Sequence, residues 1–340
     1  MGEQERRLNN MKAKFGFRKR VKTYIICLVL LFVGVLGSIF ISEEDYGNWE
    51  FKIRQIDIDK ILEYFDIKTN TAQNTSEGIL SVFEIDVAQG KSIFARSEGH
   101  ALLIDAGDVE YGARVVDFLK QKKQDKLDYL IITHPHNDHI GGAAEVIKNF
   151  KVGEVLMPEI NKDIIPTTPT YEKFLNVLLN KKVKLRCVGK DEEFKLGLAE
   201  IKIFSGLSKN ANNLNNTSLV TKISYNKWSF LSTGDIEKTA EKDLIKDDSS
   251  LKSNVLDIAH HGSRTSTTPE FLKAVQPDIA FISVGFNEYG HPSQKVLNRL
   301  SKNNVKYFST QKDGTLQLNI YKDYYTVLNS HGKELFKKAA

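Results

Sequence analysis

Cysteine is scarce: the 340 residues contain only Cys27 and Cys187. Cys27 lies in a long apolar run, whereas Cys187 lies in the segment VKLRCVG, which has the pattern of a strand. If the apolar run crosses a membrane, the two thiols lie in different compartments and cannot pair. A disulfide framework is therefore excluded, and neither cysteine has the spacing of a thiolate metal site.

An excess of one charge is also missing from most of the chain. The formal net charge is +5, but residues 1–22 hold eight of the 48 basic residues and two of the 43 acidic ones. The rest has 40 basic and 41 acidic residues, a net charge of −1. The basic balance therefore does not predict a nucleic-acid-binding surface on the main part of the chain. The basic segment is instead expected to meet anionic lipid headgroups.

Long apolar runs are absent with one exception, residues 23–42, TYIICLVLLFVGVLGSIFIS, which are 20 residues without a charge. A helix of about 20 apolar residues spans a bilayer. Basic residues precede this run and Glu43, Glu44 and Asp45 follow it, which predicts a cytoplasmic amino terminus and an extracytoplasmic main domain. A cleaved signal peptide is the alternative. The run exceeds the roughly 7–15 apolar residues of such peptides, which favours an uncleaved, single-pass anchor in the cell membrane.

The chain is therefore expected to have four parts. Residues 1–22 form a basic cytoplasmic tail, 23–42 the transmembrane anchor, 43–78 a stalk and linker, and 79–340 one folded domain. The linker TNTAQNTSEG at 69–78 contains no apolar residue larger than alanine, which is typical of a loop.

Within the folded domain, strand and helix patterns alternate. Helices are predicted at 115–123, 139–150, 235–245, 268–275 and 293–300, and strands at 79–87, 92–96, 101–107, 127–133, 218–225, 228–234, 254–260 and 278–285. Because some neighbouring strands are hairpin-like and others are separated by helices, the pattern predicts an α/β domain with a mixed sheet covered by helices.

The histidines are concentrated. Six of the eight fall in three places, each at or beyond the end of a predicted strand: His134, His136 and His139; His260 and His261; and His291. Asp235 follows a further strand, in FLSTGD. Loops at strand ends are where a rigid scaffold directs functional side chains into a cleft, so these residues are candidates for a metal site.

The spacing of the first cluster has a geometric meaning. His134 and His136 lie two residues apart, so in an extended segment both point to one side. Asp138 and His139 follow where the chain turns into a helix, so they can point elsewhere. One short loop can therefore serve two adjacent metal ions, and a carboxylate such as Asp235 can bridge them through its two oxygens.

These motifs resemble those of a known family. HPHNDH at 134–139 matches the H-x-H-x-D-H motif of the metallo-β-lactamase fold. More narrowly, the domain resembles the carboxy-terminal hydrolase domain of ComEC, the DNA-uptake protein of bacterial competence. The further matching segments, in family order, are DVAQGKS (86–92), NNTSLV (215–220), STGDIE (232–237), HHGSRTS (260–266) and, more loosely, NEYGHP (287–292). The resemblance covers roughly residues 79–327.

The resemblance implies an αββα sandwich with two divalent metal ions, zinc or manganese with iron as a further option, at one edge. His134 and His136 would hold the first ion, Asp138 and His139 the second, and Asp235 would bridge them. His261 would complete the second site, with His260 as the alternative. Asp138, His260 and His291 are the candidate catalytic residues, and a histidine that is not a ligand could protonate the leaving group.

The sequence departs from the family at two points. No histidine lies between His139 and His260, where relatives have another histidine that binds the first metal. Three alternatives follow for the first site: it binds metal weakly, a water molecule replaces the missing ligand, or His291 replaces it. The family segment D-V-G-Q-G-D ends in an acid, but this chain has Lys91. We expect Lys91 to lie beside the metals and contact a substrate phosphate; the alternative is a solvated loop lysine.

The remaining candidate substrate-binding residues are polar side chains in the other motif segments. Asn216 and Ser218 either contact substrate or satisfy the backbone. Arg264 is expected to bind a phosphate, because guanidinium groups suit planar oxyanions; the alternative is a solvated loop charge. Ser263 precedes it in the same segment.

The most direct functional expectation is an extracytoplasmic phosphodiesterase or nuclease, with a nucleic acid or another phosphodiester as its substrate and no predicted protein partner. Two alternatives stay open. One is a choline-phosphate-esterase-like hydrolase of phosphorylated cell-envelope polymers, which would need an aromatic cage; Trp228, Phe286 and Tyr289 are the aromatic residues near the motifs. The other is a membrane-tethered scaffold that has lost turnover.

Overall fold

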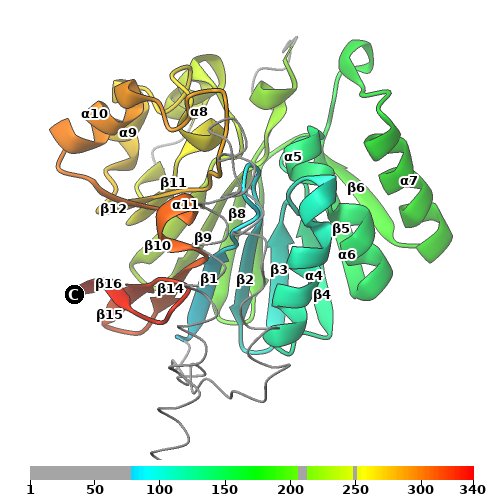
Figure 1. Ribbon diagram of the computed structural model, residues 1–340, viewed down its shortest axis with the longest axis horizontal. Helices are drawn as coiled ribbons and strands as arrows, with labels where there is room; N and C mark the ends of the chain where they lie inside the picture. The colour runs from blue at the N-terminus through cyan, green and yellow to red at the C-terminus, as the bar shows by residue number, and fades with distance from the viewer. Residues whose placement is uncertain (1–77, 206–212, 248–250) are drawn as a thin grey trace, which may run out of the picture. The chain divides into compact units, whose positions relative to one another are not determined.

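The computed structural model describes residues 78–205, 213–247 and 251–340, all within one compact unit, Thr71–Ala340 (Figure 1). The predicted tail, the anchor at 23–42 and the stalk up to residue 77 lie outside the described residues. Within the described ranges, no helix has the length and apolar character needed to cross a bilayer.

Two β-sheets form the centre of the unit. The first has nine strands in the order β16-β15-β14-β1-β2-β3-β4-β5-β6, and the second has seven in the order β13-β12-β11-β10-β9-β8-β7. The strands of the first sheet are β1 (Leu80–Glu84), β2 (Ile93–Ser97), β3 (His100–Ile104), β4 (Lys126–Ile131), β5 (Lys151–Pro158), β6 (Lys184–Val188), β14 (Leu316–Ile320), β15 (Tyr324–Leu328) and β16 (Glu334–Ala339). Those of the second sheet are β7 (Glu192–Leu196), β8 (Ala199–Phe204), β9 (Val220–Tyr225), β10 (Trp228–Ser232), β11 (Val255–Asp257), β12 (Ile279–Ile282) and β13 (Lys306–Ser309).

Helices cover the outer face of each sheet, which gives four layers (Figure 1). The helices beside the first sheet are α4 (Gly112–Gln121), α5 (Asn137–Ile140), α6 (Ala143–Asn149) and α7 (Pro169–Lys181). Those beside the second sheet are α8 (Lys238–Asp247), α9 (Pro269–Val275) and α10 (Gln294–Lys302), and the short α11 (Thr310–Asp313) precedes β14. The expectation of an αββα sandwich is thus confirmed.

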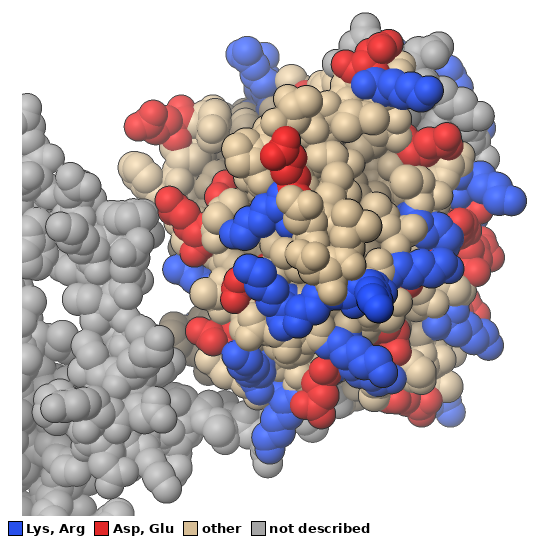
Figure 2. Space-filling view, turned by 90° about the vertical axis from the view of Figure 1, so that its right-hand side faces the viewer, with Lys and Arg blue, Asp and Glu red and all other residues tan. Residues whose placement is uncertain are grey.

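The apolar core follows these layers. One cluster, which includes Ile104, Ile131 and Phe230, lies between the two sheets. A second packs α4, α6 and α7 onto the first sheet, and a third packs α8, α9 and α10 onto the second. The face over α4, α6 and α7 carries Lys and Arg interspersed with Asp and Glu (Figure 2), so this face is not a uniformly basic surface.

Strand direction determines where the functional loops meet. β3, β4, β5 and β6 run parallel in the first sheet, and β10, β11, β12 and β13 run parallel in the second. Parallel strands end at the same edge, and loops at their carboxyl ends form the usual binding crevice of α/β sheets. The loops after β3, β4, β10 and β11 carry the candidate residues described below.

The structure also differs from the sequence-based reading. The single mixed sheet indicated by the strand pattern is two mixed sheets. The predicted helix at 139–150 is divided into α5 and α6 at Gly141 and Gly142. A Cβ on Gly142 would lie 2.2 Å from the carbonyl oxygen of Ala106, so glycine allows this turn to approach the end of β3 closely.

Candidate metal centre

Three loops deliver the candidate ligands. The chain leaves β4 at Ile131 and passes through His134 to α5, which contains Asp138 and His139. Asp235 follows β10, and the turn Ala259–Gly262 after β11 carries His261. Residues more than 100 positions apart in sequence therefore meet because their strands end at one edge.

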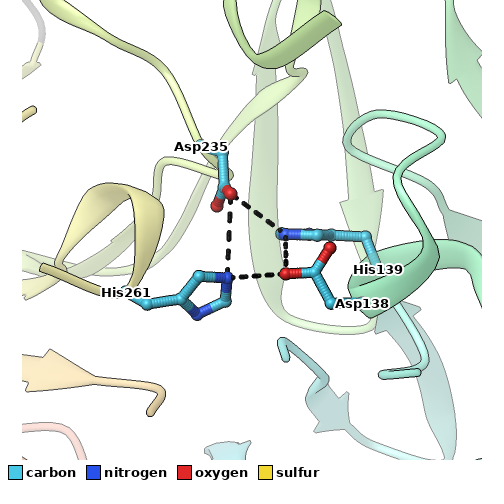
Figure 3. Close-up of side chains that lie close together, drawn as sticks. All are labelled: Asp138, His139, Asp235 and His261. Carbon is cyan, nitrogen blue, oxygen red and sulfur yellow. Dashed lines mark hydrogen bonds and ion pairs between the residues drawn. The ribbon is translucent and has the colours of Figure 1, made fainter. Parts of the chain in front are cut away.

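Asp138, His139, Asp235 and His261 form a compact group, with one ligand-type atom of each within 4.8 Å of all the others. The side chains point toward one another from the three loops (Figure 3). Asp235 Oδ2 lies 3.3 Å from His139 Nε2 and 3.7 Å from His261 Nε2. Asp138 Oδ2 lies 3.2 Å from His261 Nε2. Two carboxylates and two imidazoles thus face one point.

Hydrogen bonds on the far side of each imidazole ring fix its orientation. His139 Nδ1 donates to Asp105 Oδ2 (2.7 Å), and His261 Nδ1 donates to the Ser283 carbonyl (2.8 Å). With Nδ1 as the donor, the other nitrogen of each ring, Nε2, is directed into the group, where a metal ion would take the place of a proton. Such outer partners are typical of metal-binding histidines.

His134 and His136 lie beside this group. The Thr133 hydroxyl donates to Asp105 Oδ2 (2.7 Å) and the Ser218 hydroxyl donates to the Asn215 carbonyl (2.7 Å). Both hydroxyl oxygens can therefore only accept from His134 Nδ1, at 3.1 and 3.3 Å. His134 Nε2 then presents a lone pair, 2.9 Å from His136 Nδ1.

The carboxyl groups of the site are ionised. Burial opposes ionisation of Asp138 and Asp235, but His139 and His261 hold the pKa of both carboxyls well below the usual range. Burial also opposes the charged form of His139, yet Asp235, Asp105 and Asp138 raise the pKa of this ring well above its usual value. The carboxylates therefore favour a positive charge at this position.

The residues fit a divalent metal ion. Asp235 Oδ1 and His139 Nε2 are buried and have no hydrogen-bond partner, which is unusual for buried polar atoms unless an ion completes the site. Carboxylate and imidazole ligands suit zinc, manganese or iron. Asp138, His139, Asp235 and His261 would hold one ion, and His134 and His136 face a neighbouring position with fewer ligands.

The choice between the adjacent histidines depends on the backbone. His260, His261 and Gly262 have φ values of 54°, 53° and 83°, a left-handed run that costs energy at both histidines. This turn points His261, which is 2% exposed, into the group. His260 Nε2 lies 3.8 Å from Asp235 Oδ2 and its Nδ1 lies 3.6 Å from Glu237 Oε1. His260 is therefore beside the group and not within it.

His291 lies further out. Its ring centroid is 5.7 Å from that of His260 and 5.8 Å from that of Tyr289. Burial, followed by the effect of His260, lowers the pKa of His291 to about 4, so the ring is neutral at pH 7. His291 does not belong to the four-residue group, and the structure shows no contact of this ring with His134 or His136 in the described part of the chain.

The prediction that Lys91 contacts a substrate phosphate is wrong. The side chain is fully buried, and Nζ donates to Asp257 Oδ2 at 2.7 Å. The lysine is therefore neither solvated nor accessible to a substrate. Its role is considered in the last subsection of these Results.

The other predicted substrate-binding residues are mostly enclosed. Asn216 Oδ1 accepts from the Glu237 amide (2.9 Å), and Ser218 Oγ accepts from the Asp235 amide (3.2 Å). Both therefore satisfy the backbone, as such side chains often do in turns, and fully buried Ser218 cannot reach a substrate. Ser263 is 5% exposed and bonds Thr265, which leaves Arg264 as the exposed member of the set.

Two residues that support the metal group, Asp105 and Asp257, were not among the predicted site residues. Asp105 holds its loop and the His139 ring by accepting from the Thr133 amide (2.8 Å) and from His139 Nδ1 (2.7 Å). Asp257 was not singled out. Its signal was a charged residue inside the apolar strand segment VLDIA, since a charge there must be paired when it is buried.

The fold and the group of metal-ligand side chains together indicate a metal-dependent hydrolase. Residues 85–285 match the family model described as "Metallo-beta-lactamase superfamily". The chain belongs to the metallo-beta-lactamase superfamily.

Within the superfamily, the chain is similar to competence proteins of the ComEC family. It is 31% identical to "ComE operon protein 3" of Bacillus subtilis over 72% of this chain and 33% of that protein. It is 30% identical to "Competence protein ComA" of Neisseria gonorrhoeae over 69% of this chain and 31% of that protein. The chain thus spans about a third of the length of these relatives.

A similar solved structure is that of CmlA, a diiron beta-hydroxylase from Streptomyces venezuelae, at 15% identity and a TM-score of 0.49. The match covers 77% of this chain and 59% of that one.

Proposed function

We propose that this protein is a membrane-anchored, extracytoplasmic, metal-dependent phosphodiesterase that acts on nucleic acid. The observation that carries the proposal is the group of Asp138, His139, Asp235 and His261, with His134 and His136 beside it. Similarity to proteins named for competence supports nucleic acid as the substrate. The uncharged run at 23–42 and its basic flank support the anchor and its orientation.

A divalent ion held by these ligands supplies an activated water and stabilises negative charge as it develops. The chain's own residues orient the centre and move protons around it. Asp105 and the Ser283 carbonyl hold the ligand rings. His260 is partly exposed, with 23% of its side chain accessible beside Asp235, so it is placed to exchange a proton with the substrate.

The choline-phosphate alternative receives less support. An aromatic cage needs exposed ring faces around a cation, but Trp228 is 3% exposed and packs against Tyr325 with ring centroids 5.1 Å apart. Phe286 and Tyr289 are 78% and 77% exposed, so only two of the three aromatic residues have ring faces that a choline group could contact.

The test is to measure the metal content and turnover of the purified full chain with manganese and with zinc. The substrate panel contains bis-p-nitrophenyl phosphate, single-stranded DNA, duplex DNA, a choline phosphodiester and a cephalosporin. We expect turnover of the DNA and the small phosphodiester. Preferential turnover of the choline ester would favour the envelope-polymer alternative, and metal binding without turnover of any member would favour the scaffold.

Two substitutions link turnover to the ligands. Asp138→Ala and Asp235→Ala should each abolish turnover without unfolding the domain, as judged by circular dichroism. Asp235→Ala should lose more metal, because its carboxylate lies within 3.8 Å of His139, His260 and His261. A double variant with wild-type activity would refute the metallohydrolase proposal.

Topology is tested separately on intact cells stripped of their wall. Protease added outside should cut the main domain if it is extracytoplasmic. A fully protected domain would reverse the proposed orientation.

A further inference from the structure

Lys91 and Asp257 form an ion pair directly behind the candidate metal centre. Their side chains are both fully buried, and Nζ lies 2.7 Å from Asp257 Oδ2. Burial opposes the charged form of Lys91, but the Asp257 carboxylate, 2.7 Å away, raises the pKa of its ammonium above the usual value. Lys91 therefore remains protonated inside the protein.

Glu84 is the third ionisable group of this buried region. It is fully buried. Burial, and then the charge of Asp257, raises the pKa of Glu84 well above its usual value, so this carboxyl is kept neutral. Lys91 and Asp257 thus form the charged pair of the region.

Lys91 contacts each of the three loops that carry metal ligands. Its amide donates to the Asp138 carbonyl at 2.9 Å. Its Nζ donates to the Gly234 carbonyl at 3.3 Å, directly before Asp235. The same Nζ lies 3.4 Å from the Ile258 carbonyl, at the start of the segment that leads to His261.

Asp257 extends the same connection. Its Oδ2 accepts from Ser232 Oγ (3.3 Å) and from the Thr233 amide (3.5 Å), and its carbonyl accepts from Thr233 Oγ1 (2.7 Å). The loop after β10 is therefore bonded to the end of β11 through Asp257. The ion pair sits where all of these bonds converge.

We propose that the buried Lys91–Asp257 pair is a positioning element that holds the loops of Asp138, Asp235 and His261 in register and thereby sets the affinity of the metal centre. Neither residue belongs to the ligand group, and Lys91 contacts the ligand-bearing loops at the backbone carbonyls of Asp138, Gly234 and Ile258. The inference rests on the metal centre of the proposed function, but it does not depend on the substrate.

A space-filling role is the competing explanation. A buried ion pair can often be replaced by apolar side chains of similar volume without loss of stability, whereas removing one partner leaves an uncompensated charge. Lys91→Met alone can therefore fail to fold for a trivial reason. The informative variant is Lys91→Met/Asp257→Leu, which removes both charges and keeps most of the volume.

The charge-exchanged variant Lys91→Asp/Asp257→Lys provides the rescue. It keeps the same two side chains and restores opposite charges at the same positions. The related segment D-V-G-Q-G-D has an acid in place of Lys91, so an acid is compatible with this type of loop.

The matched control is Arg186→Met/Glu154→Leu. This pair joins the neighbouring strands β5 and β6, with two N–O distances of 3.1 Å, and neither residue belongs to the metal group. The control removes an ion pair of the same domain without touching the ligand-bearing loops.

The full chain of each variant is examined in two ways. Competition titration with a zinc chelator measures metal affinity, and hydrogen exchange of the metal-free protein measures opening of residues 233–235 and 258–262. We expect the Lys91→Met/Asp257→Leu variant to fold and to bind zinc at least about tenfold more weakly than the wild type. Its amide hydrogens should exchange faster in these two segments. The charge-exchanged variant should recover most of the affinity, and the control should match the wild type.

Wild-type affinity and exchange in the folded neutral variant would overturn the proposal and leave the pair a filler of space. A folded charge-exchanged variant that recovers no affinity would overturn it as well, because the effect would then not depend on the ion pair. A wild-type protein that binds no zinc or manganese would instead refute the metal centre. In that case the hydrogen exchange of the metal-free variants still decides whether the pair holds the loops.

Discussion

Asp105→Asn provides the most discriminating test of how the metal centre is oriented. Asp105 has a φ of 57°, a conformation that asparagine tolerates as well as aspartate. The substitution therefore keeps the backbone and the side-chain shape. The retained amide oxygen can still accept from the Thr133 amide, now 2.8 Å from Asp105 Oδ1.

The change occurs at the other oxygen, which becomes an NH2 group facing His139 Nδ1 at 2.7 Å. Two donors cannot hydrogen-bond to each other, so Nδ1 of His139 must give up its proton, and the proton that the ring retains is on Nε2. The proton then occupies the lone pair that faces Asp235 across 3.3 Å. A metal ion must displace the proton and restore the tautomer against an unfavourable contact.

Loss of such an outer partner weakens metal binding by roughly 10- to 100-fold, which is about 1.4–2.8 kcal/mol. Zinc or manganese affinity of the full chain, measured by chelator competition, should fall by this factor. Circular dichroism of the metal-free protein should change little, because the bond from the Thr133 amide is kept and the two bonds at Oδ2, from His139 Nδ1 and from Thr133 Oγ1, are reversed at constant volume.

Asp128→Asn is the matched control. Asp128 Oδ2 accepts from the Ala101 amide (2.9 Å) and lies 3.2 Å from His100 Nδ1, so it too bonds a backbone amide and a histidine. It lies at the opposite end of β3 from Asp105. Unchanged metal affinity in Asp105→Asn, or an equal loss in Asp128→Asn, would show that Asp105 does not orient His139.

Three further outcomes are expected. His261→Gln should remove about one bound ion per chain, because His261 Nε2 faces the ligand group. His260→Gln should keep the ion but lower turnover. Equal metal loss in the two variants, measured by elemental analysis, would contradict this assignment. Phe286→Ala/Tyr289→Ala should weaken binding of single-stranded DNA by about 1–3 kcal/mol per stacked base, since both rings are exposed, and should leave the KM of a small phosphodiester without a base unchanged. Arg264→Ala should raise KM for DNA most at low salt, because screening weakens exposed charge contacts; a penalty that does not vary with ionic strength would exclude a phosphate contact.

The histidine motifs predicted the kind of site because their chemistry is local. HPHNDH places two imidazoles, a carboxylate and a third imidazole on one short loop after a strand, and no other region of the chain has this density of ligand-type residues. The positions of Asp235 and His261 after other predicted strands could also be recognised, since strand ends follow from apolar patterns.

Lys91 shows where sequence reasoning was insufficient. Its motif places it beside the metal edge, but sequence does not state whether a side chain points outward to a substrate or inward to Asp257. These residues are 166 positions apart, and their pairing depends on how the loop after β1 meets the end of β11. Lys91 was predicted to contact a substrate, but its hydrogen-bond partners are buried groups of the protein.

The sequence by itself determined the ligand types, their order along the chain and the alternation of strands and helices, because each of these depends on neighbouring residues. Only the tertiary structure decided the order in which the strands pair within the two sheets, that His261 and not His260 enters the ligand group, and that Lys91 is buried. These outcomes depend on long-range strand pairing and on a left-handed turn at His260, His261 and Gly262. Residue type does not determine either feature, since the strain of that turn persists only where the surrounding packing imposes it.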